Sequence, residues 1–386
     1  MNPPGGGGGG GAQPNAEVPP GAPSANIRCG GRSPSPWAPI ARLGNATFSV
    51  VVRYDARMAT EAYQPTAFGW KRQLRVRTGD DITLCVERIA PSGPCQGAVI
   101  LCHGLASNGM VFDLPGRSLA RYLAEHGLEC FIPDLRGARY SSAPSGGWCL
   151  DDYLEQDLPA LLQLVREQAL SEQVHWVGHS LGGILCLMYA SERPEAPLSR
   201  VVTIGSSLDY RPGNSVYQQL RKALPLVRPV NALPFSYLTK LSAAVSNYVQ
   251  LTPERMNFYR PNIEADVVRS MLQDGFGPIP TGLLRDLSST FTAGGFARRG
   301  GLLRYEELWP RYRLPTLLLV GSRDPQCNIA AVDETIRLIG HVEELEVRPL
   351  GREFGHQEDY GHFDLILGRN AKQESWPLIL NWLQRS

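Results

Sequence analysis

The sequence predicts an α/β fold in which a mainly parallel, doubly wound sheet carries helices on both faces. Short apolar runs, typical of buried parallel strands, alternate with segments whose apolar residues recur every three or four positions, as in helices. The alternation stops over a long stretch before the last strands, which we interpret as an inserted helical cap. The predicted parallel strands lie at residues 98–104, 130–135, 174–180, 200–206 and 316–322.

Two further strands are predicted ahead of the first of these runs. The segments RQLRVRT and ITLCVERIA alternate in polarity and are joined by a GDD turn, which indicates a hairpin. Helices are predicted between the later strands, because each intervening segment has one apolar face. The clearest helical segments are RSLARYLAEHG, DDYLEQDLPALLQLVREQ, the residues after Ser180, and DETIRLIG.

The chain divides into four predicted regions. Residues 1–45 are rich in Gly, Pro, Ala and Ser and have too few large apolar side chains to form a core, so we expect a disordered tail. Residues 46–210 and 313–386 are predicted to form the two parts of the sheet core. Residues 211–312 contain helix-like pieces but no run of buried strand, and we expect them to form the cap.

The composition argues against several classes of protein. With 38 basic and 37 acidic side chains the net charge is +1, and no basic and aromatic residues interleave, so nucleic acid is not an expected partner. We see neither a signal peptide nor an apolar run of the ~18 residues that a membrane span needs, and we predict a cytoplasmic protein. The eight cysteines lack metal-binding spacing and are expected to be reduced core residues. Neither a metal nor a cofactor is expected, and nothing indicates an oligomeric state.

The strongest chemical signal is the pattern G-x-S-x-G around Ser180. Gly178-His179-Ser180-Leu181-Gly182 directly follows a predicted buried strand and precedes the helix-like segment GILCLMYA. A sharp strand-to-helix turn exposes a nucleophile, and the flanking glycines avoid clashes with neighbouring elements. We therefore predict that Ser180 is a catalytic nucleophile.

A serine hydroxyl is a weak nucleophile at neutral pH, so a histidine base must lie within hydrogen-bond reach. Among seven histidines, His362 follows the last strand-like run, EELEVRPL, and precedes the last helical segment, ESWPLILNWLQ. This position gives the chain order nucleophile, acid, base that a G-x-S-x-G hydrolase requires. His362 is the predicted base, and His356 is the fallback.

The base must in turn be held in one tautomer by an acid. Asp324 lies in the turn LLLVGSRDPQC, four residues after Val320, the last valine of the penultimate predicted strand. That position predicts Asp324 as the orienting acid. Asp364, two residues beyond His362, is interpreted as a structural carboxylate and remains the alternative acid.

Acyl transfer also needs backbone N–H groups that stabilise a developing oxyanion. We assign one donor to Leu181, directly after the nucleophile, and the other to Leu105 in the HG-x turn that follows the first parallel strand. We also expect His103, Gly104 and His179, which flank these groups, to contact substrate.

Several of these motifs together resemble the α/β-hydrolase superfamily, namely HGLAS at 103–107, DLRG at 134–137, GHSLGG, VGSRD and GHFD. Within it, the HGLAS turn, the helix containing YLEQDLPALL and the His-x-Asp near the end are similar to acid lipases of the gastric and lysosomal type and their bacterial relatives. The resemblance covers residues 68–208 and 315–383. It implies an α/β-hydrolase fold, the triad Ser180, Asp324 and His362, and a cap over an acyl pocket.

We therefore predict a serine hydrolase that cleaves small-molecule carboxylic esters through an acyl-enzyme. Apolar pieces of the cap such as LPLVRPVNALPF either line a pocket for the acyl chain or form the cap's own core. Acyl transfer, and thioester or amide hydrolysis, remain alternatives on the same triad. A ligand-binding protein without catalysis is the alternative of a different class, disfavoured because every member of the predicted triad is present.

Overall fold

The computed structural model describes residues 63–66, 69–212, 218 and 230–385. Its centre is a nine-stranded sheet in which six neighbouring strands are parallel and three at one edge are antiparallel. The strands, in spatial order, are β1 (Tyr63–Thr66), β2 (Gly69–Arg77), β3 (Thr83–Ile89), β5 (Leu128–Asp134), β4 (Gly97–Cys102), β6 (Val174–His179), β7 (Val201–Ile204), β12 (Thr316–Gly321) and β13 (Leu345–Leu350).

The central strands are parallel because their sequences suit burial on both faces. Every residue of β4, β6 and β12 is buried, and in β4 and β12 apolar side chains point alternately into the two halves of the core. The predicted hairpin forms as β2 and β3, which pair antiparallel. The predicted fold class, a mainly parallel α/β sheet of the α/β-hydrolase type, is confirmed.

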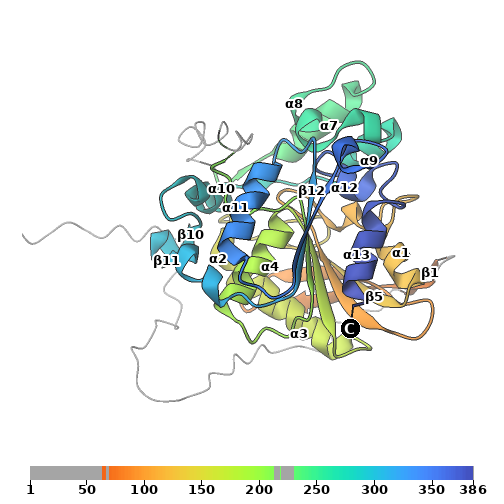
Figure 1. The fold of residues 1–386 in the computed structure, drawn as a ribbon. Helices are drawn as coiled ribbons and strands as arrows, with labels where there is room; N and C mark the ends of the chain where they lie inside the picture. The colour runs from red at the N-terminus through yellow and green to blue at the C-terminus, as the bar shows by residue number, and fades with distance from the viewer. Residues whose placement is uncertain (1–62, 67–68, 213–217, 219–229, 386) are drawn as a thin grey trace, which may run out of the picture.

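Helices cover both faces of the sheet (Figure 1). One face carries α3 (Leu158–Gln168), α4 (Leu181–Glu192) and α11 (Ile329–Ile339), and the other carries α1 (Leu119–Glu125), α12 (Asp364–Leu367) and α13 (Ser375–Leu383). Polar side chains cap two helices: Ser118 accepts from the Arg121 N–H of α1, and Asn328 accepts from the Ala331 N–H of α11. Helix α4 is buried around almost its whole circumference, so it lies at the centre of its layer.

The segment predicted as one helix before the nucleophile is divided into three pieces. A short α2 (Leu150–Asp152) passes into a π-helical turn, η3 (Tyr153–Asp157), and then into α3. Pro159 occupies the first turn of α3, where its missing N–H costs little. The departure from a regular helix directly precedes this proline, which cannot continue the usual hydrogen-bond ladder.

Between β7 and β12 the chain leaves the sheet, and we call the residues between these strands the insertion. It contains short strand pairs of two residues each and several helices, which lie over one end of the sheet (Figure 1). Its elements are β8 (Ala232–Leu233), α7 (Phe235–Val245), α8 (Thr252–Asn257), α9 (Ala265–Asp274), β9 (Ile279–Pro280), α10 (Thr281–Leu287), β10 (Ala297–Arg298) and β11 (Leu303–Arg304).

A buried ion network fastens the last part of the insertion to the core. The Arg298 guanidinium is almost fully buried and donates to Glu192 at the end of α4, to Asp151 in α2 and to Glu155 in η3. A buried charge is tolerated only where partners surround it, and removing Arg298 would also take away the ion-pair partner of Asp151 and one of the two arginines beside Glu192 and beside Glu155. The network fixes this part of the insertion against the helices beside Ser180.

The predicted tail, residues 1–45, and most of the segment VYQQLRKAL lie outside the described residues. The domain boundaries at 45, 210 and 312 therefore stay predictions. Within the part of the chain that is described, no helix combines the length and apolarity needed to cross a membrane.

Candidate active site

Ser180 lies in a sharp turn between β6 and α4. Its backbone angles, φ 53° and ψ −119°, are ones that residues with a side chain rarely adopt. Two contacts hold them: the Ser180 N–H donates to the Ile204 carbonyl (2.7 Å), and the Ser206 hydroxyl donates to the Ser180 carbonyl (2.7 Å). A Cβ at Gly182 would lie 2.2 Å from the Cys102 carbonyl oxygen, so only glycine permits this close approach.

His362 and Asp324 form a buried pair beyond the end of β12. The His362 Nδ1 lies 2.6 Å from Asp324 Oδ2, and the other carboxylate oxygen accepts the N–H groups of Gln326 (2.8 Å) and Cys327 (3.0 Å). Because a carboxylate held in this way only accepts, Nδ1 carries the proton and Nε2 is left as the acceptor. This is the tautomer that a general base toward a hydroxyl needs.

The turn that carries Ser180 lies next to His362. The ring of His179 is 4.6 Å from the His362 ring between centroids, and a Cβ on Gly205 would lie 3.0 Å from His362 Nδ1. No hydrogen bond joins the Ser180 hydroxyl to the His362 ring in the described part of the chain. Such bonds are often long in the absence of substrate and tighten only in the complex.

His179 lies behind Ser180 and faces the loop of the predicted base. Its Nε2 is 3.2 Å from the His362 carbonyl oxygen, and since a carbonyl only accepts, Nε2 carries the proton. Burial lowers the pKa of His179 well below its usual value, with the nearby His362 adding to the effect. A neutral His179 therefore holds the backbone of the base, and it is not part of the cavity wall described below.

His103 holds the HG-x loop, residues 103–105, through contacts of its ring with backbone groups. The Leu135 N–H donates to its Nε2 (3.1 Å), and its Nδ1 lies 2.9 Å from the Gly104 carbonyl oxygen. Burial lowers the pKa of His103 to about 4, in keeping with a neutral ring that has one donor and one acceptor. The loop that it fixes is close to Ser180, because a Cβ on Gly104 would lie 2.9 Å from Ser180 Cβ.

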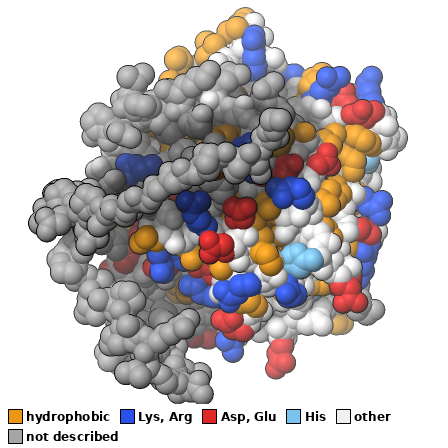
Figure 2. Space-filling model, turned by 60° about the vertical axis from the view of Figure 1, so that its left-hand side comes forward, with side chains coloured by type: hydrophobic (Ala, Val, Ile, Leu, Met, Phe, Trp, Pro, Cys, Tyr) orange, Lys and Arg blue, Asp and Glu red, His pale blue; other side chains and the backbone are white. Residues whose placement is uncertain are grey.

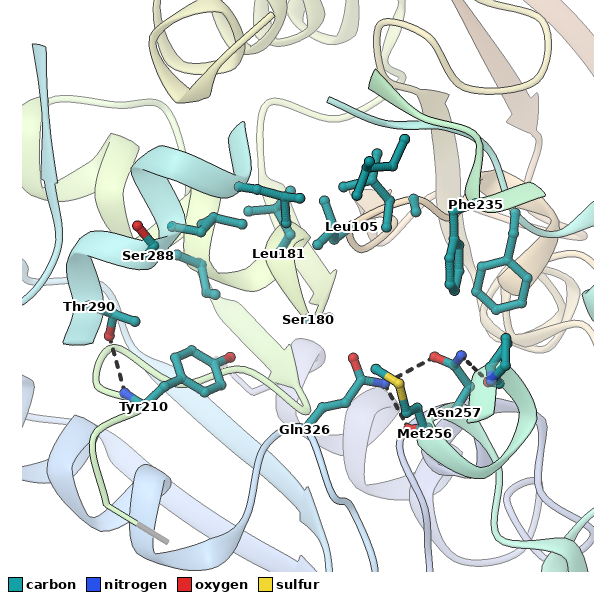
Figure 3. A pocket seen from close by; sticks show the side chains of 18 of the residues that line it. Leu105, Ser180, Leu181, Tyr210, Phe235, Met256, Asn257, Ser288, Thr290 and Gln326 are labelled. Atoms are coloured by element: carbon teal, nitrogen blue, oxygen red, sulfur yellow. Dashed lines mark hydrogen bonds between the residues drawn. The ribbon is translucent and has the colours of Figure 1, made fainter. Parts of the chain in front are cut away.

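A cavity of about 360 Å³ opens beside Ser180 between the sheet core and the insertion. Figure 3 shows Ser180 near its centre, with Leu105 and Leu181 on one side and Gln326, Met256 and Asn257 on the other. Leu105 and Leu181 thus share the wall with Ser180. His103, Gly104 and His179, which we expected to contact substrate, are not among the described residues that line the cavity, and their contact with substrate stays a prediction.

Most of the apolar wall comes from the insertion, and sequence reasoning identified little of it. Leu233 and Phe235 belong to the apolar piece LPLVRPVNALPF, whose first residues lie outside the described part of the chain. The remaining residues were missed, because they come from short helices and loops that converge only in the fold. They include Leu238, Pro253, Met256, Phe276, Ile279, Leu284, Leu287, Phe291 and Phe296.

None of the described residues that line this cavity carries a charge. The polar ones are hydroxyl and amide side chains, and one of these amides is fixed: the Gln326 Nε2 donates to the Met256 carbonyl (2.9 Å) and to Asn257 Oδ1 (3.0 Å). An ionised ligand would lose its hydration here without gaining a counter-ion. The cavity wall therefore suits neutral, apolar groups.

The fallback residues occupy other positions. The His356 Nδ1 lies 3.2 Å from the Gly351 carbonyl oxygen, in a loop that does not contribute to the cavity. Asp364 is fully buried below the predicted base, where its Oδ2 accepts the N–H groups of Gly361 (3.0 Å) and Tyr259 (2.9 Å). Asp364 thus joins the base loop to the insertion, and burial raises its pKa to about 8.

This raised pKa predicts how stability depends on pH. An unfolded aspartate loses its proton near pH ~4, whereas folded Asp364 keeps its proton up to about 8, so wild-type stability falls as pH rises through this window. In Asp364→Asn the amide oxygen would still accept from both N–H groups, and the new side chain has no proton to lose. We expect the unfolding free energy of Asp364→Asn, relative to wild type, to rise by up to ~1.4 kcal/mol per pH unit in guanidinium titrations between pH ~5 and ~8.

Asp359→Asn is the control, because Asp359 lies in the same loop. Burial acts to raise its pKa, but hydrogen bonds from the Arg352 N–H and Ser322 prevail, and its pKa is lowered. The Asp359→Asn replacement should therefore change the unfolding free energy by the same amount at every pH between ~5 and ~8. A constant difference for Asp364→Asn as well would show that folded Asp364 is already ionised.

Residues 97–367, which make up most of the chain, match a protein family described as the alpha/beta hydrolase fold. The sheet order, the strand-turn-helix around Ser180 and the insertion between β7 and β12 agree with this match. The protein therefore belongs to the α/β-hydrolase fold family, as its motifs indicated.

Within this family the chain resembles lipases and esterases. It is 24% identical to triacylglycerol lipase 1 of Arabidopsis thaliana over 80% of this chain and 86% of that protein. Human lysosomal acid lipase/cholesteryl ester hydrolase is 30% identical over 31% of this chain and 34% of its own length. A 2-(acetamidomethylene)succinate hydrolase of Mesorhizobium japonicum is 31% identical over 67% of this chain and 80% of its own.

Solved structures agree on the fold. A monoacylglycerol lipase of Paleococcus ferrophilus superposes with a TM-score of 0.55 at 18% identity, covering 78% of this chain and 98% of the other. An esterase of Exiguobacterium antarcticum gives a TM-score of 0.55 at 15% identity, covering 81% and 99%.

Proposed function

We propose that the protein hydrolyses carboxylic esters with an apolar acyl chain, and that Ser180, His362 and Asp324 are its catalytic triad. The observation that carries the proposal is the cavity, because it combines Ser180 in its wall with a mostly apolar lining that has no charged side chain among the described residues. The hydrogen-bonded His362–Asp324 pair behind this wall supports the proposal.

In the first step the Ser180 Oγ attacks the ester carbonyl carbon while His362 Nε2 takes the hydroxyl proton. The resulting oxyanion is stabilised by the N–H groups of Leu105 and Leu181, the latter in the first turn of α4, where N–H groups have no partner within the helix. Asp324 keeps His362 in the required tautomer and stabilises its charged form. His103 and His179 act through the loops that they hold.

Collapse of the tetrahedral intermediate breaks the ester C–O bond, and His362 returns the proton to the leaving alcohol. Water then attacks the acyl-enzyme carbonyl, with His362 again taking the proton. The acid is released and Ser180 regains its hydroxyl proton. Each step uses only the chain's own groups and water.

The cavity predicts a preference for longer, neutral acyl chains. Because each buried methylene contributes ~0.8 kcal/mol, kcat/KM for p-nitrophenyl esters should rise about fourfold per added carbon until the cavity is full. The measurement is a series of p-nitrophenyl esters from acetate to palmitate, each kept in true solution.

A charged acyl group provides the control. The p-nitrophenyl monoester of succinate resembles the butyrate in length but adds a carboxylate, and we expect its kcat/KM to be at least about tenfold lower. Equal or faster cleavage of the succinate ester would contradict the proposed substrate class. It would instead favour a hydrolase of small ionised substrates.

A further inference from the structure

The outward face of α7 exposes large apolar side chains at one end of the molecule. The exposed fractions are 76% for Tyr237, 56% for Leu238 and 59% for Leu241, and the loop after the helix exposes 91% of Tyr248 and 46% of Val249. We call these five residues the α7 surface. Figure 2 shows hydrophobic side chains at the same end of the molecule at which Figure 1 places α7.

The polarity of α7 is the reverse of that in a helix facing water. The residues that it buries are small and mostly polar: Thr239, Ser242, Ala243 and, just after the helix, Ser246. This narrow face packs against α9. A helix on a water-exposed surface normally buries its large apolar residues and exposes polar ones. Here the large apolar residues point outward, which indicates that this face meets an apolar medium.

The segment that contains α7 also lacks acidic side chains. The chain has 37 carboxylates in 386 residues, so a stretch of 24 residues would contain about two on average. Residues 230–253, all of them described, contain none, and their single charged side chain is Lys240, which is exposed. Tyrosine, leucine and one cation without carboxylates suit the interface of a membrane that contains anionic lipid.

The α7 surface is continuous with the cavity. Leu238 is more than half exposed and also lines the cavity. Leu233, just before the helix, and Phe235, its first residue, line the cavity as well. An acyl chain that left a lipid layer at the α7 surface would therefore meet apolar side chains from the surface to the neighbourhood of Ser180. This continuity favours a lipid layer over a partner protein as the occupant, because a lipid layer can supply the group that fills the cavity.

We propose that the α7 surface docks the protein on a phospholipid membrane containing anionic lipid, so that ester substrates pass from the lipid layer into the cavity. The proposal rests on the proposed ester hydrolysis for its purpose, but docking itself does not require catalysis. Tyr237, Leu241 and Tyr248 enter the interface, and Lys240 lies among the headgroups.

The test compares two double variants of the full chain. Leu241→Gln with Tyr248→Gln removes apolar side chains of the α7 surface that do not line the cavity. Leu170→Gln with Leu302→Gln removes two equally exposed leucines elsewhere. Binding is measured by flotation with vesicles of phosphatidylcholine and phosphatidylglycerol, and catalysis by hydrolysis of dissolved p-nitrophenyl butyrate.

We expect the wild type, Ser180→Ala and the control double variant to bind vesicles alike, and the α7 double variant to bind at least about tenfold more weakly. All except Ser180→Ala should hydrolyse the dissolved ester within about twofold of the wild type. Because Ser180→Ala binding reports docking alone and dissolved-ester hydrolysis reports catalysis alone, failure of either proposal can be recognised separately.

Two results would overturn the docking proposal. One is wild-type protein that does not float with the vesicles, or that floats equally well when the α7 surface is altered. The other is a concentration-dependent dimer, seen by analytical ultracentrifugation without lipid, that the α7 double variant abolishes while vesicle binding is unchanged. That result would assign the surface to a second copy of the chain.

Discussion

Replacing Ser180 with alanine is expected to reduce kcat for p-nitrophenyl esters by about 10⁵-fold or more, while the protein folds normally. The alanine keeps the turn between β6 and α4 but removes the oxygen that we propose forms the acyl-enzyme. The Leu105 and Leu181 N–H groups would still bind an oxyanion, so a small rate above that in water should remain. Steady-state kinetics and labelling by a fluorophosphonate measure the two consequences.

Ser288→Ala is the matched control, since Ser288 also lines the cavity but its hydroxyl donates to the Arg285 carbonyl at the end of α10. It should keep activity within a few-fold of the wild type and should still be labelled. Undiminished activity in Ser180→Ala would refute the assigned nucleophile. Absence of both hydrolysis and labelling in the wild type would favour the ligand-binding alternative.

Replacing Asp324 with asparagine is expected to lower kcat by about 10⁴-fold. The new amide can donate to His362 Nδ1 and so favour the tautomer with the proton on Nε2, which cannot take a proton from Ser180. The replacement also removes the negative charge that stabilises the imidazolium. Because substrate contacts the cavity wall and not Asp324, KM should change little.

Asp364→Asn distinguishes the two candidate acids. The groups that donate to Asp364 in the described part of the chain are backbone N–H groups, and its carboxyl is largely protonated at neutral pH, so the asparagine mimics its normal state. We expect kcat within about tenfold of the wild type for this variant. A large loss in Asp364→Asn together with a small one in Asp324→Asn would reverse the assignment.

Much of the fold could be predicted because burial leaves a direct pattern in the sequence. The runs that became β4 and β12 are continuous apolar segments of strand length, a composition that suits a strand buried on both faces. Element ends were less accurate. Helix α11 begins four residues before the predicted DETIRLIG, since the cap by Asn328 is visible only once its bond to Ala331 is known.

The candidate site was predictable to the extent that local motifs encode it. The turn at Ser180 needs glycines at fixed offsets, and this leaves a signature that can be read without a structure. The cavity wall has no such signature, because Phe276 and Phe296 differ little in sequence context from core residues. The expected substrate contacts of His103 and His179 stay predictions, because the motifs do not encode side-chain direction and both rings hydrogen-bond to backbone groups.

The neutral lining of the cavity bears on how the product of the proposed ester hydrolysis leaves. An ester and its alcohol are uncharged, but the acid product ionises at neutral pH and is then far better hydrated outside the cavity than within it. Ionisation therefore expels the product and opposes its return to Ser180. In the proposed hydrolysis, the absence of charged side chains from the described wall would therefore hasten release of the acid product once it has lost its proton.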